Sequence, residues 1–270
     1  MADPVTPTAV PTAALPDPTP PPSSAVAART VDAGRGAAWW SEAWRLFAAA
    51  PGPWLLIVLI LLVLNVVLLV IPVVGHIAMQ LLYPVFAGGL LLGCRAIDRG
   101  QPLTVNHLFA GFGERTGPLL ILGLLYLCLA IAITLAVAGI LLVFFGAAVF
   151  SRLFQLTDPF SAAAAVGSIL TIVLFGMLLF MLLFLPLFMA IWFAPALVVL
   201  RGLEPWAAMK ASLAACLKNV LPFLIYGLVG FVLAIVASIP LMLGWLVLGP
   251  LTIASVYTGY CDIFEDAAVS

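Results

Sequence analysis

Blocks of apolar residues, each about as long as a membrane-crossing helix, recur along this sequence. No Asp, Glu, Lys, Arg or His lies in the middle of any block. A helix of about 20 apolar residues crosses a hydrocarbon core of roughly 30 Å. The chain is 65% hydrophobic and 8% charged, whereas a soluble domain carries charge on about a quarter of its residues. The sequence therefore predicts an all-α, polytopic membrane protein whose main partner is the lipid bilayer.

The apolar blocks divide most simply into six spans, at residues 53–73, 76–97, 118–147, 164–200, 220–240 and 243–263. The fourth span is unusually long, because a helix over 164–200 would measure about 55 Å at 1.5 Å per residue. Pro186 and Pro195 predict a kink in this helix. An alternative with seven spans breaks it at Pro186.

The positions of the basic residues decide between the six-span and the seven-span division of the chain. With six spans, every Lys and Arg except Arg152 falls on one face of the membrane. With seven spans, Arg201, Lys210 and Lys218 would move to the opposite face. That arrangement conflicts with the tendency of basic loops to stay in the cytoplasm. We therefore expect six spans, with the N-terminus and the C-terminus both cytoplasmic.

The two ends of the chain differ from the apolar middle. Residues 1–36 are rich in Pro, Ala and Thr and contain no aromatic residue, a composition that cannot offset its conformational entropy by burial. We expect a disordered cytoplasmic tail at 1–36, a six-helix domain at 37–265 and an acidic cytoplasmic C-terminus at 266–270. The acidic residues Asp262, Glu265 and Asp266 are expected to be solvated, and Asp98 to form a surface ion pair with Arg95.

An internal repeat groups the spans into three tandem hairpins of the same orientation. A short amphipathic segment and then a proline precede spans one, three and five. Apolar side chains recur in these segments at helical spacing: Trp40, Trp44 and Phe47 in the first, Val105, Leu108, Phe109 and Phe112 in the second, and Met209, Leu213, Cys216 and Leu217 in the third. Each segment is predicted to be an interfacial helix at the cytoplasmic headgroups.

The residues that catalysis needs are largely missing. The only histidines, His76 and His107, fall on opposite faces of the predicted membrane and cannot share a metal ion. The sequence contains no nucleophile elbow, phosphate-binding loop or HExxH motif. The net charge of −1 does not favour nucleic acid as a partner. We expect no catalytic residue, no cofactor, no metal and no enzymatic activity.

Uncharged polar residues inside the spans form the one candidate site. If they line a cavity among the hairpins, they would mark a path for a hydrophobic or amphiphilic molecule. The alternative is hydrogen bonding between helices, which is worth roughly 1 kcal/mol per bond. The residues of this candidate polar cluster are Asn65, Gln80, Tyr83, Tyr126 and Tyr226.

Several segments together resemble a known family: GCRAIDRGQPL (93–103), HLFAGFGERTGPLL (107–120), FAPALVVL (193–200) and KASLAACLKNVLPFLIYGLV (210–229). They resemble uncharacterised multi-pass inner-membrane proteins of Gram-negative bacteria that contain a domain of unknown function. More distantly, the plan is similar to the membrane domain of some glycerophosphodiester phosphodiesterases. The resemblance covers about residues 38–265. It implies a bacterial inner-membrane location and transfers no functional residue.

Two functions fit these observations. The first is a non-enzymatic protein that organises lipids or acts as an accessory to other membrane proteins. Its partner, or a second copy of the chain, would contact apolar surface on spans three and four near Phe144, Phe145, Phe150 and Phe154. Serine at positions 150 and 154 should then weaken assembly. The alternative is a transporter or a flippase-like conduit that uses the candidate polar cluster.

Overall fold

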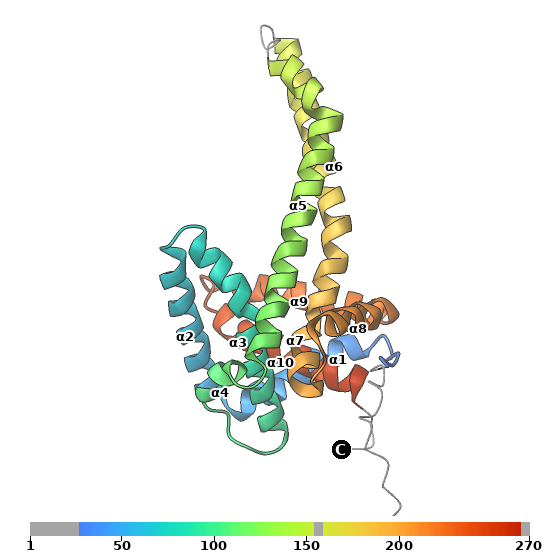
Figure 1. Ribbon diagram of the computed structural model, residues 1–270. Coiled ribbons are helices and arrows are strands. Elements are labelled where there is room, and N and C mark those ends of the chain that lie inside the picture. The colour runs from blue at the N-terminus through green and yellow to red at the C-terminus, as the bar shows by residue number, and fades with distance from the viewer. Residues whose placement is uncertain (1–26, 154–158, 266–270) are drawn as a thin grey trace, which may run out of the picture.

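The computed structural model describes residues 27–153 and 159–265. Most of the expected tail and the C-terminal segment 266–270 lie outside the described residues. Within these ranges the chain is helical and has no strand (Figure 1). Its helices are α1 (Arg35–Ala49), α2 (Pro51–Leu69), α3 (Val74–Asp98), α4 (Asn106–Phe109), the 3₁₀ turn η1 (Ala110–Phe112), α5 (Thr116–Leu153), α6 (Pro159–Trp192), α7 (Ala194–Arg201), α8 (Pro205–Lys218), α9 (Val220–Ser238) and α10 (Trp245–Phe264).

Six helical stretches are long and apolar enough to cross a membrane: Pro51–Leu69, Val74–Asp98, Thr116–Gly146, Val166–Arg201, Val220–Ser238 and Trp245–Phe264. They match the six predicted spans, and the chain is an all-α, multi-pass membrane protein. Successive stretches contact one another in pairs, α2 with α3, α5 with α6 and α9 with α10. The predicted grouping into three tandem hairpins is therefore present.

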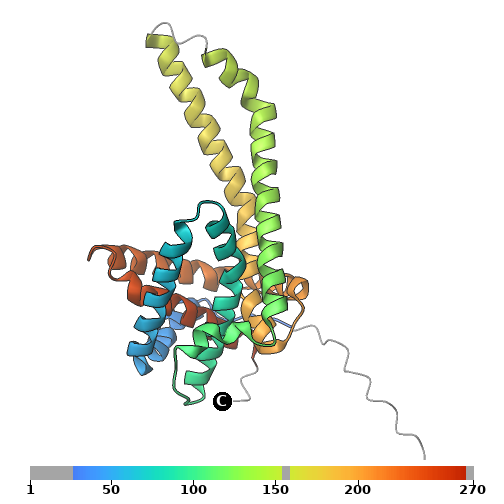
Figure 2. The same cartoon turned by 60° about the vertical axis from the view of Figure 1, so that its left-hand side comes forward.

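The three hairpins differ in length and direction. α5 has 38 residues, about 57 Å of helix, and with α6 it extends far beyond the other hairpins (Figure 1). The α2–α3 hairpin runs roughly alongside the long one, whereas α9 and α10 lie across it (Figure 2). The α9–α10 hairpin packs on α1, α2 and α3. The three hairpins thus share a base but not a common axis.

Exposed aromatic side chains lie along the α5–α6 hairpin. Phe144 and Phe150 are both largely exposed. Phe145 instead packs on Phe175 of α6, with ring centroids 5.6 Å apart. Phe154 lies outside the described residues. Much of this hairpin therefore presents apolar surface to its surroundings.

The first amphipathic helix, α1, is packed within the bundle. Trp39, Trp40 and Phe47 are buried, and α1 contacts α9 and α10. Trp44, which was predicted to lie on one apolar face with Trp40 and Phe47, is 54% exposed. Trp39 is buried instead, and its indole N–H donates to a carboxylate oxygen of Asp262 at 2.9 Å. A hydrogen-bonded indole can be buried at little cost.

The second and third amphipathic segments also pack on the bundle. Gly89 of α3 and Gly111 of η1 lie where a Cβ would collide with backbone atoms of the opposing segment, so α4 and η1 sit directly on α3. Phe109 and Phe112 remain half exposed. α8 packs along α6 and buries Met209 and Cys216.

The fourth span is interrupted, but not at Pro186. α6 continues through this proline and ends at Trp192. The interruption lies at Phe193, whose N–H donates to the hydroxyl of Ser212 at 2.9 Å. The same hydroxyl donates to the carbonyl of Met189 at 2.7 Å. Ser212 therefore bridges the gap that a regular α-helix would close with its own backbone hydrogen bond.

Charged residues join the helices at the base. Asp262 accepts hydrogen bonds from Arg29 and from Arg35, the latter at 2.5 Å. Its side chain is only 15% exposed, so the expectation of a solvated Asp262 is wrong. The hydrogen bond to Asp262 raises the pKa of Arg35 above its ordinary value. Asp98 pairs with Arg45 at 3.6 Å, a partner on α1 in place of the expected Arg95.

The segment before α1 is held against this base. The N–H of Val31 donates to the side-chain oxygen of Asn219 at 2.9 Å, and the amide nitrogen of Asn219 donates to the carbonyl of Arg29 at 3.0 Å. Lys218 donates to the carbonyl of Ala28 at 2.7 Å. Packing of the chain therefore begins before residue 37. We refer to residues 28–34 as the N-terminal strap.

Candidate functional site

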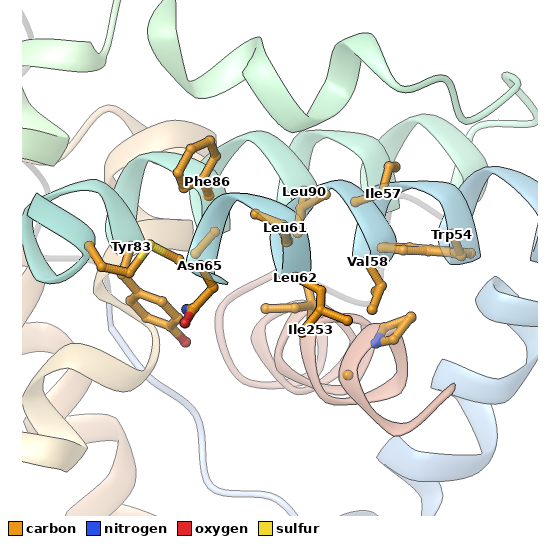
Figure 3. A pocket seen from close by; sticks show the side chains of 14 residues that line it. Trp54, Ile57, Val58, Leu61, Leu62, Asn65, Tyr83, Phe86, Leu90 and Ile253 are labelled. Carbon is orange, nitrogen blue, oxygen red and sulfur yellow. The ribbon is translucent and has the colours of Figure 1, made fainter. Parts of the chain in front are cut away.

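A partly open cavity lies among α2, α3 and α10. Its volume is about 370 Å³, within the range of small-molecule sites. We call it the lateral groove, and Figure 3 shows the side chains that line it. They are almost all apolar: Trp54, Ile57, Val58, Leu61, Leu62, Asn65, Met79, Tyr83, Phe86, Ala87, Leu90, Gly249, Pro250 and Ile253.

Each helix contributes differently to the lateral groove. α2 supplies aliphatic side chains at helical spacing, because Ile57, Leu61 and Asn65 recur every four residues on one face. α10 leaves room at Gly249, where even an added Cβ would only reach Val58 at 4.0 Å. The lateral groove therefore exists because α10 lacks a side chain at this position.

The two ends of the lateral groove differ in polarity. At one end Trp54 is fully buried, and its indole N–H donates to the carbonyl of Leu46 at 3.3 Å. Asn65 and Tyr83 both line the lateral groove and appear toward its other end in Figure 3. Tyr83 is 51% exposed. The lateral groove thus combines long apolar walls with a pair of uncharged hydrogen-bonding groups at one end.

A second cavity of about 220 Å³ adjoins the lateral groove. The two share Tyr83, Ala87 and Ile253 in their walls. Gln80 and Tyr126 also line this second cavity. Four residues of the candidate polar cluster therefore line two adjoining cavities, with Tyr83 common to both.

Tyr226, the fifth residue of the cluster, lies elsewhere. It is buried, and its hydroxyl lies 2.8 Å from that of Ser255. Its ring stacks on Trp40, with centroids 4.8 Å apart. Tyr226 lines neither of the two cavities described above, and its side chain contacts Trp40 and Ser255 instead.

Sequence reasoning missed the apolar walls and a further polar residue of the second cavity, Thr252. Apolar residues occupy nearly every position of the spans, so composition does not distinguish a groove wall from a lipid-facing surface. A glycine–proline pair at 249–250 in the middle of the last span was the one available signal. Such a pair is unusual in a helix interior, because it removes a side chain and a backbone donor together.

The chemistry that these cavities can support is binding. Their polar groups are amides and hydroxyls, which donate and accept hydrogen bonds without changing charge near neutral pH. Within residues 27–153 and 159–265, no three His, Cys, Asp or Glu side chains gather in a way that could hold a metal ion. The arrangement fits an elongated apolar ligand that carries one uncharged polar group.

Comparisons with protein families, with curated proteins and with solved structures found no match for this chain. The resemblance to inner-membrane proteins of Gram-negative bacteria therefore stays a prediction.

Proposed function

We propose that this chain is a non-enzymatic protein of a bacterial inner membrane that binds a lipid or another amphiphile in the lateral groove and so organises lipid around itself. The lateral groove carries the proposal, because it is partly open and is formed by membrane-spanning helices with exposed apolar side chains. A ligand could enter from the bilayer without passing through water. Asn65 and Tyr83 would bind its polar group.

The termini are proposed to face the cytoplasm. The basic residues Arg29, Arg35 and Arg45 pair with acidic residues at the shared base of the hairpins. Arg201 lies at this base too, where it donates to the hydroxyl of Tyr260 at 3.1 Å. An excess of basic residues marks the cytoplasmic side of inner-membrane proteins.

The experiment that tests binding is native mass spectrometry of the protein released from its own membrane. Leucine at position 249 should fill the lateral groove and remove the bound amphiphile, because the backbone there has room for a side chain. The matched control is Gly227→Leu, since Gly227 lies on the exposed face of α9 with open space around its Cα. Equal lipid retention by Gly249→Leu, Gly227→Leu and the unmodified protein would count against the proposal.

A conduit is a second candidate, favoured by the adjoining cavities that meet at Tyr83. If a ligand passes from one cavity to the other, the protein should speed the exchange of a fluorescent lipid between the leaflets of a vesicle. Gly249→Leu should slow this exchange and Gly227→Leu should not. Exchange no faster than in protein-free vesicles would exclude the conduit.

A docking role for α5 and α6 is favoured by their exposed aromatic side chains, such as Phe144 and Phe150. A partner or a second copy would cover this surface. Serine at positions 150 and 154 together should then reduce the size of the complex in a mild detergent. An unchanged size would show that lipid alone covers the hairpin.

A further inference from the structure

The connection between α9 and α10 is entirely apolar. Between Ser238 and Trp245 the sequence reads IPLMLG, and Leu241 is 92% exposed. By contrast, the α5–α6 hairpin carries Arg152 near the end of α5 and Asp158 just before the start of α6. A loop that reaches water on the far side of a membrane normally carries polar residues, whereas this one would expose a row of large aliphatic side chains to water.

Three N–H groups of this connection find acceptors within the turn itself. The N–H groups of Leu241, Met242 and Leu243 donate to Ile239, Ser238 and Pro240 respectively. Pro240 has no N–H group, and the Trp245 indole donates to the hydroxyl of Ser238 at 3.1 Å. Leu241 and Met242 adopt positive φ angles of 51° and 64° to make this turn. Internal pairing of backbone groups is what a chain needs inside hydrocarbon, where no water can bind them.

The direction of α9 and α10 adds a geometric argument. They lie across the axis of α5 and α6 (Figure 2), so the two hairpins cannot both run along the bilayer normal. The α5–α6 hairpin is the longer one, and the polar residues between its helices have to reach water. The α9–α10 hairpin is therefore the one that is strongly inclined to the normal.

We propose that α9 and α10 form a re-entrant hairpin, which enters the bilayer from the charged base and ends within the hydrocarbon of the same leaflet. Both of its ends support this placement. Lys218 and Asn219 precede α9 and bind the N-terminal strap, and Asp262 near the end of α10 binds Arg29 and Arg35. The occupant around residues 239–243 is the acyl chains of that leaflet. This inference does not depend on a ligand in the lateral groove.

The re-entrant hairpin places helix volume in one leaflet only. α5 and α6 displace lipid from both leaflets, whereas α9 and α10 displace it mainly from the leaflet on the charged side. An element of this kind changes the lateral pressure of one leaflet. The exposed apolar surface at residues 239–243 therefore contacts lipid, and not a protein in the opposite aqueous phase.

The depth of the α9–α10 connection in the bilayer can be tested by the accessibility of a new cysteine thiol. Leu241→Cys and, as a control, Ser151→Cys would be treated with a membrane-impermeant maleimide in spheroplasts and in inverted vesicles. Peptide mass spectrometry would separate each new thiol from the native cysteines. We expect Leu241→Cys to remain unlabelled in both preparations and Ser151→Cys to be labelled in spheroplasts. Labelling of Leu241→Cys in either preparation would place the connection in water and overturn the proposal.

A charge at the same position provides a second test, which also covers the case in which another protein shields Leu241. Arginine inside hydrocarbon costs several kcal/mol, so Leu241→Arg should lose most of its membrane-inserted protein. Leu153→Arg is the control, because it adds the same charge beside the polar segment between α5 and α6. Equal yields of inserted Leu241→Arg and Leu153→Arg would overturn the re-entrant hairpin.

Discussion

The hydroxyl group of Ser212 replaces a backbone hydrogen bond that the fourth span lacks at Phe193. It accepts a hydrogen bond from the N–H of Phe193 at 2.9 Å and donates one to the carbonyl of Met189 at 2.7 Å. Ser212 is fully buried, so no water can take over this role. The interruption is what separates α6 from α7, and α7 in turn contacts α3.

Ser212→Ala should therefore destabilise the protein. The substitution leaves the Phe193 N–H without a partner and removes one donor from the Met189 carbonyl, which costs about 1–3 kcal/mol. Thermal unfolding in detergent measures the effect. Ser41→Ala is the matched control, because Ser41 is exposed and its hydroxyl bonds only within α1. Equal unfolding temperatures for the two variants would contradict the bridging role.

The pairing of Arg35 with Asp262 should contribute a constant stability across the alkaline range. The hydrogen bond to Asp262 raises the pKa of Arg35 above its ordinary value, so the contribution is complete below that ordinary value and is lost only as the pH rises through the raised one. We expect Arg35→Gln to unfold at a lower temperature than the unmodified protein. The difference in unfolding temperature between the two proteins should be the same at about pH 7 and pH 10. A difference that shrinks as the pH rises would contradict this assignment.

Much of the helical plan could be predicted from sequence. Apolar length located all six spans, because in lipid each crossing segment must satisfy its own backbone. The break at Phe193 could not be located this way. Pro186 and Pro195 were the two local signals for a kink. α6 continues through Pro186, whereas Pro195 lies in the first turn of α7, directly after the break. The decisive residue, Ser212, lies on another helix, and its contact with Phe193 exists only after the chain has folded.

The candidate polar cluster was only partly predictable for a similar reason. Asn65 and Tyr83 stand out as polar residues in apolar spans, and both line the lateral groove. Tyr226 has the same sequence signature but packs against Trp40 and Ser255. Side-chain polarity indicates that a residue has a partner, but not whether that partner is a cavity or another helix.

Asn219, at the junction of α8 and α9, makes two of the hydrogen bonds that hold the N-terminal strap. Asn219 is buried and bonds to Val31 and Arg29 of the strap, at 2.9 and 3.0 Å. Asn219→Ala should release the strap and make the bond after Arg29 more susceptible to trypsin. Asn106→Ala on the exposed surface of α4 is the control. Unchanged cleavage of Asn219→Ala would show that the strap is held mainly by other contacts.

On the scale of the whole molecule, charge and hydrophobic length give the three hairpins different roles. The charged base fixes one aqueous side, the α5–α6 hairpin reaches beyond the other two, and the α2–α3 and α9–α10 hairpins enclose the lateral groove. The base joins all three, because α1 contacts α2, α3, α9 and α10. The angle between hairpins could not be predicted from sequence, since apolar patterns specify length and face but not direction.

This plan places both termini on the same side of the membrane, whether or not α9 and α10 cross the bilayer. A crossing hairpin and a re-entrant hairpin both return the chain to the side where it entered. With the proposed cytoplasmic side, a green fluorescent protein fused to either end should fluoresce in bacteria, and alkaline phosphatase fused to either end should be inactive. An active phosphatase at the C-terminus alone would require an odd number of crossings. That result would contradict the pairing of Arg29 with Asp262, because the two residues would then lie on opposite sides of the membrane.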